Sequence, residues 1–130
     1  MSTATLQEWA TRAAFCTVGV IHLLPLVGVS GRRALEKAYG IPVESPDLQL
    51  LLQHRAVLFG LLGAACLIAA FNAPWRPAVW CAALISTCSF MLLAWLAPST
   101  NSAIARVVWA DGVAIAALLI ALVVHLFHTK

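Results

Sequence analysis

The chain has 130 residues, of which 62% are hydrophobic and only 10% are charged. Ordinary soluble domains carry about 25% charged residues, so this composition argues against a soluble protein and predicts one compact membrane domain over residues 1–130. The formal net charge of +3 is scattered, with no basic run interleaved with aromatic residues, which excludes nucleic acid as a partner.

The first apolar stretch covers residues 13–29 and ends at Ser30-Gly31. The preceding segment, MSTATLQEWATR, lacks the basic start and the small-residue cleavage site of a removed signal peptide. We therefore expect this stretch to be retained as the first membrane-spanning helix.

A long connection follows the first stretch. It contains the run RRALEKAY and then Gly40, a pattern that predicts a short helix with a glycine C-cap. Leu35 and Tyr39 share one face, so we expect this helix to lie on the membrane surface and cover the mouth of the bundle. Ser45-Pro46 then predicts an N-cap and a first-turn proline for the next helix.

Three further apolar stretches cover residues 48–71, 78–97 and 104–127. A bilayer core about 30 Å thick needs about 20 helical residues, and the short turns between these stretches predict antiparallel neighbours. The predicted fold class is an all-α, up-down-up-down four-helix integral membrane bundle with both termini on the same side. A face of small or polar residues that favours close helix packing consists of Gln53, Ala56, Gly60 and Ala64.

The tryptophans agree with this topology, because Trp favours membrane–water interfaces. They form two belts: Trp9, Trp75 and Trp80 on the side of the termini, and Trp95 and Trp109 on the opposite side. The Lys and Arg residues lean only slightly toward a cytoplasmic long loop, so both orientations stay open.

Six polar residues inside or at the lip of the predicted helices form the candidate ligand-binding cluster. They are His22, Gln53, His54, Arg55, Arg106 and Asp111, and the topology places them on the side of the long loop. An Asp or Arg in a spanning segment costs roughly 2.5–3.5 kcal/mol on insertion scales, so its presence requires a partner or a purpose. Asp111 is five positions from Arg106 and diverges from it around the helix, so we expect Asp111 to pair with Arg55 or His22.

Simpler roles stay open for most of this cluster. Arg106 fits a snorkelling interfacial anchor, and His54 and Arg55 also fit an interfacial position. His22 precedes Pro25 by three residues and fits a structural histidine bonded to a backbone carbonyl.

The sequence contains no motif for catalysis or metal binding. Its cysteines, which form no C-x-x-C, lie in apolar segments where packing is their usual role; they are Cys16, Cys66, Cys81 and Cys88. G-x-S-x-G, H-E-x-x-H and a glycine-rich phosphate loop do not occur. We therefore predict no catalytic residues and no metal ligands.

Three function classes remain. The favoured class is a small membrane protein with a polar pocket at one membrane face, which binds a lipophilic small molecule or serves as a subunit of a homo-oligomer or larger membrane complex. The second is a redox anchor for haem b or quinone, in which His22 and His54 act as bis-imidazole haem ligands. The third and least favoured is a small dimeric transporter in which Asp111 couples protons.

Several segments carry a resemblance to known proteins: HLLPLVGV from His22, YGIP from Tyr39, QHRAVLFGLLGA from Gln53, and ARVVWAD ending at Asp111. They resemble a group of small four-helix bacterial inner-membrane proteins of unassigned activity, and the pattern is more distantly similar to DoxX-like proteins. Members of that group often carry the name phosphopantetheine adenylyltransferase, a soluble enzyme with an H-x-G-H motif that this sequence lacks. The resemblance implies the fold and an inner-membrane location, and it implies no chemistry.

Overall fold

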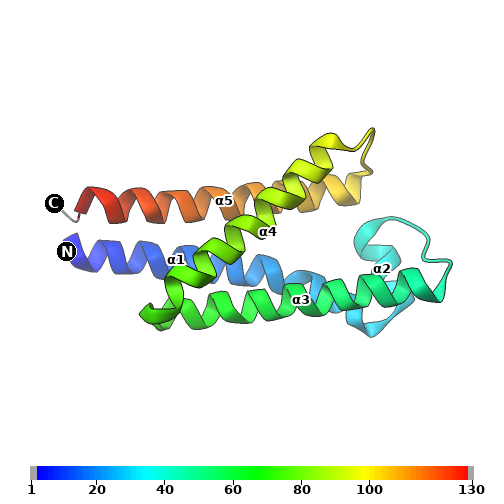
Figure 1. The fold of residues 1–130 in the computed structure, drawn as a ribbon, viewed down its shortest axis with the longest axis horizontal. Helices are drawn as coiled ribbons and strands as arrows, with labels where there is room; N and C mark the ends of the chain where they lie inside the picture. The colour runs from blue at the N-terminus through cyan, green and yellow to red at the C-terminus, as the bar shows by residue number, and fades with distance from the viewer. Residues whose placement is uncertain (1–2, 129–130) are drawn as a thin grey trace.

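The computed structural model describes residues 3–128, and all of their secondary structure is helical. The elements in chain order are α1 (Thr3–Leu23), η1 (Leu24–Ser30), α2 (Arg32–Tyr39), α3 (Pro46–Phe71), η2 (Ala73–Trp75), α4 (Arg76–Leu96) and α5 (Ser102–His128). Figure 1 shows the start of α1 and the end of α5 at one end of the bundle and α2 at the other. The predicted all-α bundle with a short helix in its first connection is confirmed.

Four helical segments are long and apolar enough to cross a membrane. They are Ala4–Ser30, Pro46–Phe71, Ala73–Leu96 and Ser102–Val124. At most 33% of the most apolar window of any of these segments is buried inside the bundle, so the outer surface of the molecule is itself apolar. An exterior of this kind suits contact with lipid, and the chain has the architecture of an integral membrane protein with four spans.

Helix α1 lies at the centre of the arrangement. It packs along both α3 and α5, whereas α4 runs obliquely from the end of α3 to the start of α5 and contacts those two helices (Figure 1). At its end of the bundle, α2 packs against η1, α3 and α5.

The first helix differs most from its predicted bounds. It begins at Thr3, ten residues before the apolar stretch, and an ion pair of 2.8 Å between Arg12 Nε and Glu8 Oε1 supports this added part. The α-helix ends at Leu23 because Pro25, without an N–H, cannot donate to the carbonyl of Ile21, and the chain continues as η1. The other three helices begin and end within two residues of their predicted bounds.

Glycines allow the backbones of α1 and α3 to approach closely. A Cβ atom added to Gly63 would lie 2.8 Å from the carbonyl oxygen of Gly19 and 3.0 Å from the backbone nitrogen of Leu23. Gly60 is also buried, but Ala64 is exposed. The predicted packing face is therefore wrong at Ala64, because the contact follows the 3.6-residue helical period and Gly63 takes that place.

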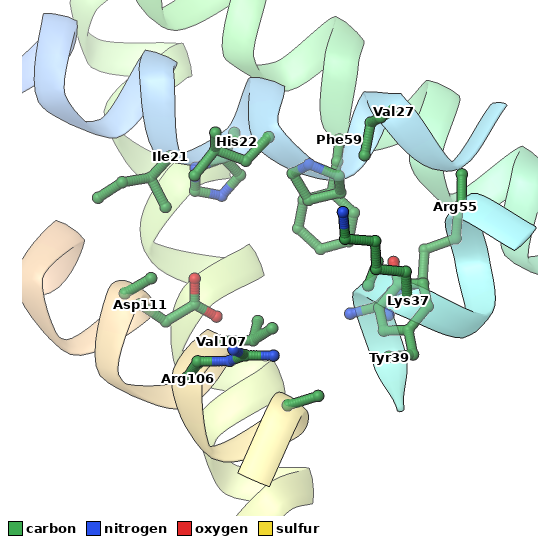
Figure 2. Close-up of a pocket in the computed structure, with 16 residues that line it drawn as sticks. Ile21, His22, Val27, Lys37, Tyr39, Arg55, Phe59, Arg106, Val107 and Asp111 are labelled. Atoms are coloured by element: carbon green, nitrogen blue, oxygen red, sulfur yellow. The ribbon is translucent and has the colours of Figure 1, made fainter. Parts of the chain in front are cut away.

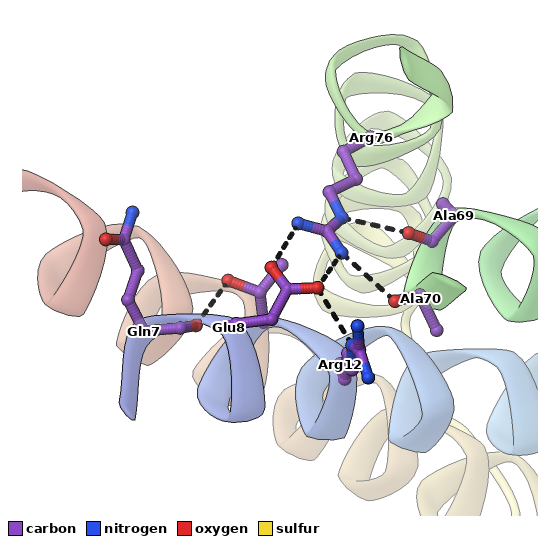
Figure 3. Close-up of polar contacts among 7 residues, drawn as sticks. Gln7, Glu8, Arg12, Ala69, Ala70 and Arg76 are labelled. Carbon is purple, nitrogen blue, oxygen red and sulfur yellow. Dashed lines mark hydrogen bonds and ion pairs between the residues drawn. The ribbon is translucent and has the colours of Figure 1, made fainter. Parts of the chain in front are cut away.

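A cluster of charged side chains joins three helices at the end of the bundle that holds the termini (Figure 3). The guanidinium of Arg76 donates to both carboxylate oxygens of Glu8, at 2.7 and 2.8 Å, and Glu8 also accepts from Arg12. Arg76 further donates to the carbonyl oxygens of Ala69 and Ala70, at 3.0 and 3.1 Å, which satisfies acceptors left free at the end of α3. The charges of Glu8, Arg12 and Arg76 are thus mutually satisfied.

Candidate functional site

Helix α2 closes the other end of the bundle. Its Leu35 is fully buried, Tyr39 is nearly so, and both pack with Val43 of the following loop. The side chain of Arg32 donates to the Val43 carbonyl, and Glu36 Oε1 accepts from the Val43 amide at 3.1 Å. The predicted surface helix is therefore packed onto the bundle, with its apolar face inward.

Asn101 ties α2 to the start of α5. Its Nδ2 donates to the Tyr39 carbonyl oxygen at 2.9 Å, and its Oδ1 accepts from the backbone N–H of Ile104 at 2.9 Å. The second contact is an N-cap of α5. Gly40, which ends α2 in the left-handed conformation at φ 63°, packs beside Asn101.

A pocket of about 520 Å³ lies beneath α2, between α1, η1, α3 and α5. Its apolar walls are formed by residues that include Ile21, Leu24, Val27, Phe59 and Val107. Its polar lining consists of His22, Lys37, Tyr39, Arg55, Arg106 and Asp111. Figure 2 shows these side chains converging from four elements of the fold.

His22 is the most deeply buried polar group of the pocket, with 1% of its surface exposed. Its Nδ1 bonds the Val18 carbonyl oxygen at 2.9 Å, one turn back along α1, and its ring centroid lies 5.5 Å from that of Phe59. The structural role proposed for His22 thus accounts for one ring nitrogen only. The other, Nε2, is buried without a hydrogen-bond partner, as is the hydroxyl of Tyr39.

Asp111 does not form the direct pair that the sequence predicts. Its side chain is buried, with 4% of the residue exposed, yet no hydrogen bond or ion pair within 4.0 Å joins it to any other side chain that the structure describes. Figure 2 shows the Asp111 carboxylate facing His22, with Arg55 across the pocket. The pocket separates Asp111 from these residues, and Asp111 interacts electrostatically with Arg55 without a direct contact.

Arg55 sits among aromatic rings. Its Cζ atom lies 5.3 Å from the ring centroid of Tyr39, 4.8 Å from that of Phe59 and 5.2 Å from that of Phe90. Each distance is within the range of a cation–π interaction. These contacts fix the guanidinium at the pocket wall, whereas an interfacial anchor would extend toward the membrane surface.

The remaining predicted residues divide between the pocket and the outside. Arg106 is exposed and lines the pocket. Gln53 lies outside the lining, where its Nε2 donates to the Val29 carbonyl oxygen at 3.0 Å and ties α3 to η1. His54 is exposed and also outside the lining, so it does not face His22 as a second axial haem ligand would. Among the side chains that the structure describes, which do not include those of His125 and His128, no three His, Cys, Asp or Glu residues gather as a metal site.

Lys37, Tyr39 and Phe59 are pocket residues that the sequence analysis did not assign to the site. Tyr39 was recognised only as part of the apolar face of α2, although a phenol on that face also brings a hydroxyl inward. The sequence of α2 alone does not show that Lys37 and Tyr39 line the pocket, because this depends on how α2 packs against the other helices.

Scans against family models, curated proteins and solved structures gave no match to this chain. The similarity to DoxX-like proteins expected from the sequence is therefore not supported. The chain is a small four-helix protein whose four long apolar helices have the length and composition of membrane spans.

Proposed function

We propose that this protein binds an amphipathic, lipophilic small molecule in the pocket beneath α2. The apolar part of the ligand lies against the walls formed by α1, η1 and α3. Its polar part faces the charged and hydrogen-bonding side chains of the lining.

The observation that carries this proposal is the pair of buried polar atoms without partners, His22 Nε2 and Tyr39 Oη, that line one pocket. Buried polar groups nearly always have a hydrogen-bond partner, and leaving one unsatisfied costs about 1–3 kcal/mol. A molecule bound in the pocket supplies partners that no described side chain supplies.

The protonation of His22 indicates which hydrogen-bonding group the ligand presents to it. A carbonyl oxygen only accepts, so Nδ1 must carry the proton that bonds Val18. In the neutral ring, Nε2 is then an acceptor that faces a hydroxyl or N–H of the ligand. The pocket volume of about 520 Å³ lies within the usual range for small-molecule sites, roughly 300–1,000 Å³.

The test is mass spectrometry of molecules that remain bound when the protein is purified in a neutral detergent. We expect one class of amphiphile to be enriched over its share in the membrane. The variant His22→Leu has nearly the same side-chain volume and removes the acceptor, so it should retain severalfold less of that molecule.

The matched control is His54→Leu, which removes an exposed histidine outside the pocket and should leave retention unchanged. Circular dichroism on both variants checks that the helices are intact. Equal retention by His22→Leu and the unchanged protein, or the lack of any enriched amphiphile, would contradict the proposal.

A further inference from the structure

We infer that the ligand of this pocket carries an anionic head group, a phosphate or a carboxylate, bound by Lys37, Arg55 and Arg106. The inference rests on the proposed function, because it assigns a ligand class to the same pocket.

The first argument is the distribution of unpaired positive charge. Within residues 3–128, three cations have carboxylate partners: Arg12 and Arg76 with Glu8, and Arg32 with Glu36. The cations of that range without an ion pair are Arg33, Lys37, Arg55 and Arg106. All of these except Arg33 line the pocket, where Asp111 supplies one carboxylate against three cations.

The second argument is the state of Arg55. The aromatic rings of Tyr39, Phe59 and Phe90 surround its guanidinium at 4.8–5.3 Å, yet its N–H groups donate to no described residue. A guanidinium has donors in a planar fork that matches the oxygens of a carboxylate or phosphate. In a membrane-spanning helix an unpaired charge is costly, and an anionic ligand offsets that cost.

The third argument is convergence. Lys37 comes from α2, Arg55 from α3 and Arg106 from α5, and Figure 2 shows all three around the same hollow. Tyr39 adds an unpartnered hydroxyl between them. Asp111 lies farther along α5, deeper in the bundle than Arg106, so it does not occupy the position where the cations meet.

The experiment is isothermal titration calorimetry on the full chain in a neutral maltoside detergent with three probes. Dodecyl phosphate has the anion and the chain, 1-dodecanol has the chain alone, and inorganic phosphate has the anion alone. We expect dodecyl phosphate to bind at least tenfold more tightly than 1-dodecanol, since hydrogen bonds to charged groups are worth about tenfold or more in affinity. It should also bind at least tenfold more tightly than inorganic phosphate, because only its chain contacts the apolar walls of the pocket. Added salt should weaken the binding of dodecyl phosphate.

Three variants test whether dodecyl phosphate binds in this pocket. Arg55→Gln should weaken dodecyl phosphate binding about tenfold or more, and Arg106→Gln, at an exposed residue whose change leaves the fold intact, should weaken it severalfold. The matched control is Arg33→Gln, which removes an unpaired, exposed charge of α2 outside the pocket and should leave the affinity unchanged.

The outcomes separate this inference from the proposed function. Equal binding of 1-dodecanol and dodecyl phosphate would overturn the anionic head group and leave the proposed amphiphile pocket standing. Binding of inorganic phosphate as tight as that of dodecyl phosphate would support the anion site and identify a soluble anion, not a lipid, as its ligand. Binding of none of the three would overturn both.

Discussion

The closest contact in the bundle predicts how three glycine-to-alanine variants should differ in stability. Gly63 lies where α3 meets α1, and an added Cβ would meet backbone atoms at 2.8 and 3.0 Å. Gly19 lies on the facing helix, where an added Cβ would lie 2.9 and 3.0 Å from side-chain atoms of Leu67 and 3.1 Å from the carbonyl oxygen of Gly63. Gly112, in α5, has no atom within 4 Å of an added Cβ.

The expected magnitudes follow from those neighbours. Alanine is favoured over glycine inside a helix by about 0.5–1 kcal/mol, and this gain applies at all three positions. At Gly63 the backbones must separate by several tenths of an ångström, and overpacking of this kind costs about 1–3 kcal/mol. We therefore expect Gly63→Ala to lose about 1–2 kcal/mol and Gly112→Ala to be neutral or slightly stabilised. Gly19→Ala should lose less than Gly63→Ala, because the Leu67 side chain can move and the backbone oxygen that the new Cβ meets lies at 3.1 Å, not 2.8 Å.

The assay is the free energy of unfolding in a detergent micelle, measured by titration with a denaturing detergent and followed by circular dichroism. Gly112→Ala serves as the control for the general effect of alanine in a helix. If Gly63→Ala unfolds at the same free energy as Gly112→Ala, then α1 and α3 do not approach as closely as described and the reasoning is refuted.

Three further variants test the two ends of the bundle. Arg76→Gln removes both bonds to Glu8 and the contacts to α3 carbonyls, so the free energy of unfolding should fall by about 1–3 kcal/mol; an unchanged value would show that the cluster adds no stability. Asn101→Ala removes the N-cap of α5, which should cost about 1 kcal/mol and increase hydrogen exchange in α2, whereas the exposed neighbour Thr100→Ala should change neither. Leu35→Ala leaves a cavity at a fully buried site and should weaken the packing of α2 on the bundle by about 2–5 kcal/mol. The expected result is faster hydrogen exchange of the amides of residues 32–43. Exchange as slow as in the unchanged protein would contradict this packing.

The fold follows from features that are local in the sequence. Apolar runs of membrane length, prolines near turns and a glycine after a short amphipathic run each act within their own segment. Hydropathy alone does not predict the start of α1, because residues 3–12 precede the apolar stretch. An ion pair within the helix and a second one with the distant Arg76 stabilise this part of α1. An ion pair between positions 8 and 76 has no local signature.

The candidate site was predictable only in part, for a related reason. Depth along a helix follows from residue number at 1.5 Å per residue. The sequence therefore predicts His22, Arg55, Arg106 and Asp111 at a similar depth, and all four line one pocket. The direction of a side chain around its helix depends on where the neighbours pack. The sequence therefore could not exclude His54, which lies one position from Arg55 yet faces outward.

The contrast between the two ends of the bundle indicates which one has a role beyond stability. At the end with the termini, Arg76 donates to Glu8 and to the carbonyls that close α3, so its charge is fully engaged in holding helices together. Beneath α2, neither Arg55 nor Asp111 forms a hydrogen bond or an ion pair within 4.0 Å with any side chain that the structure describes, and the two interact electrostatically without direct contact. A bundle that needed these charges only for stability would pair them as the other end does, because breaking a buried pair is strongly destabilising. Charges kept apart across a hollow are instead available to a third molecule, and for that reason the pocket beneath α2 is the part of this protein to which a function should be assigned.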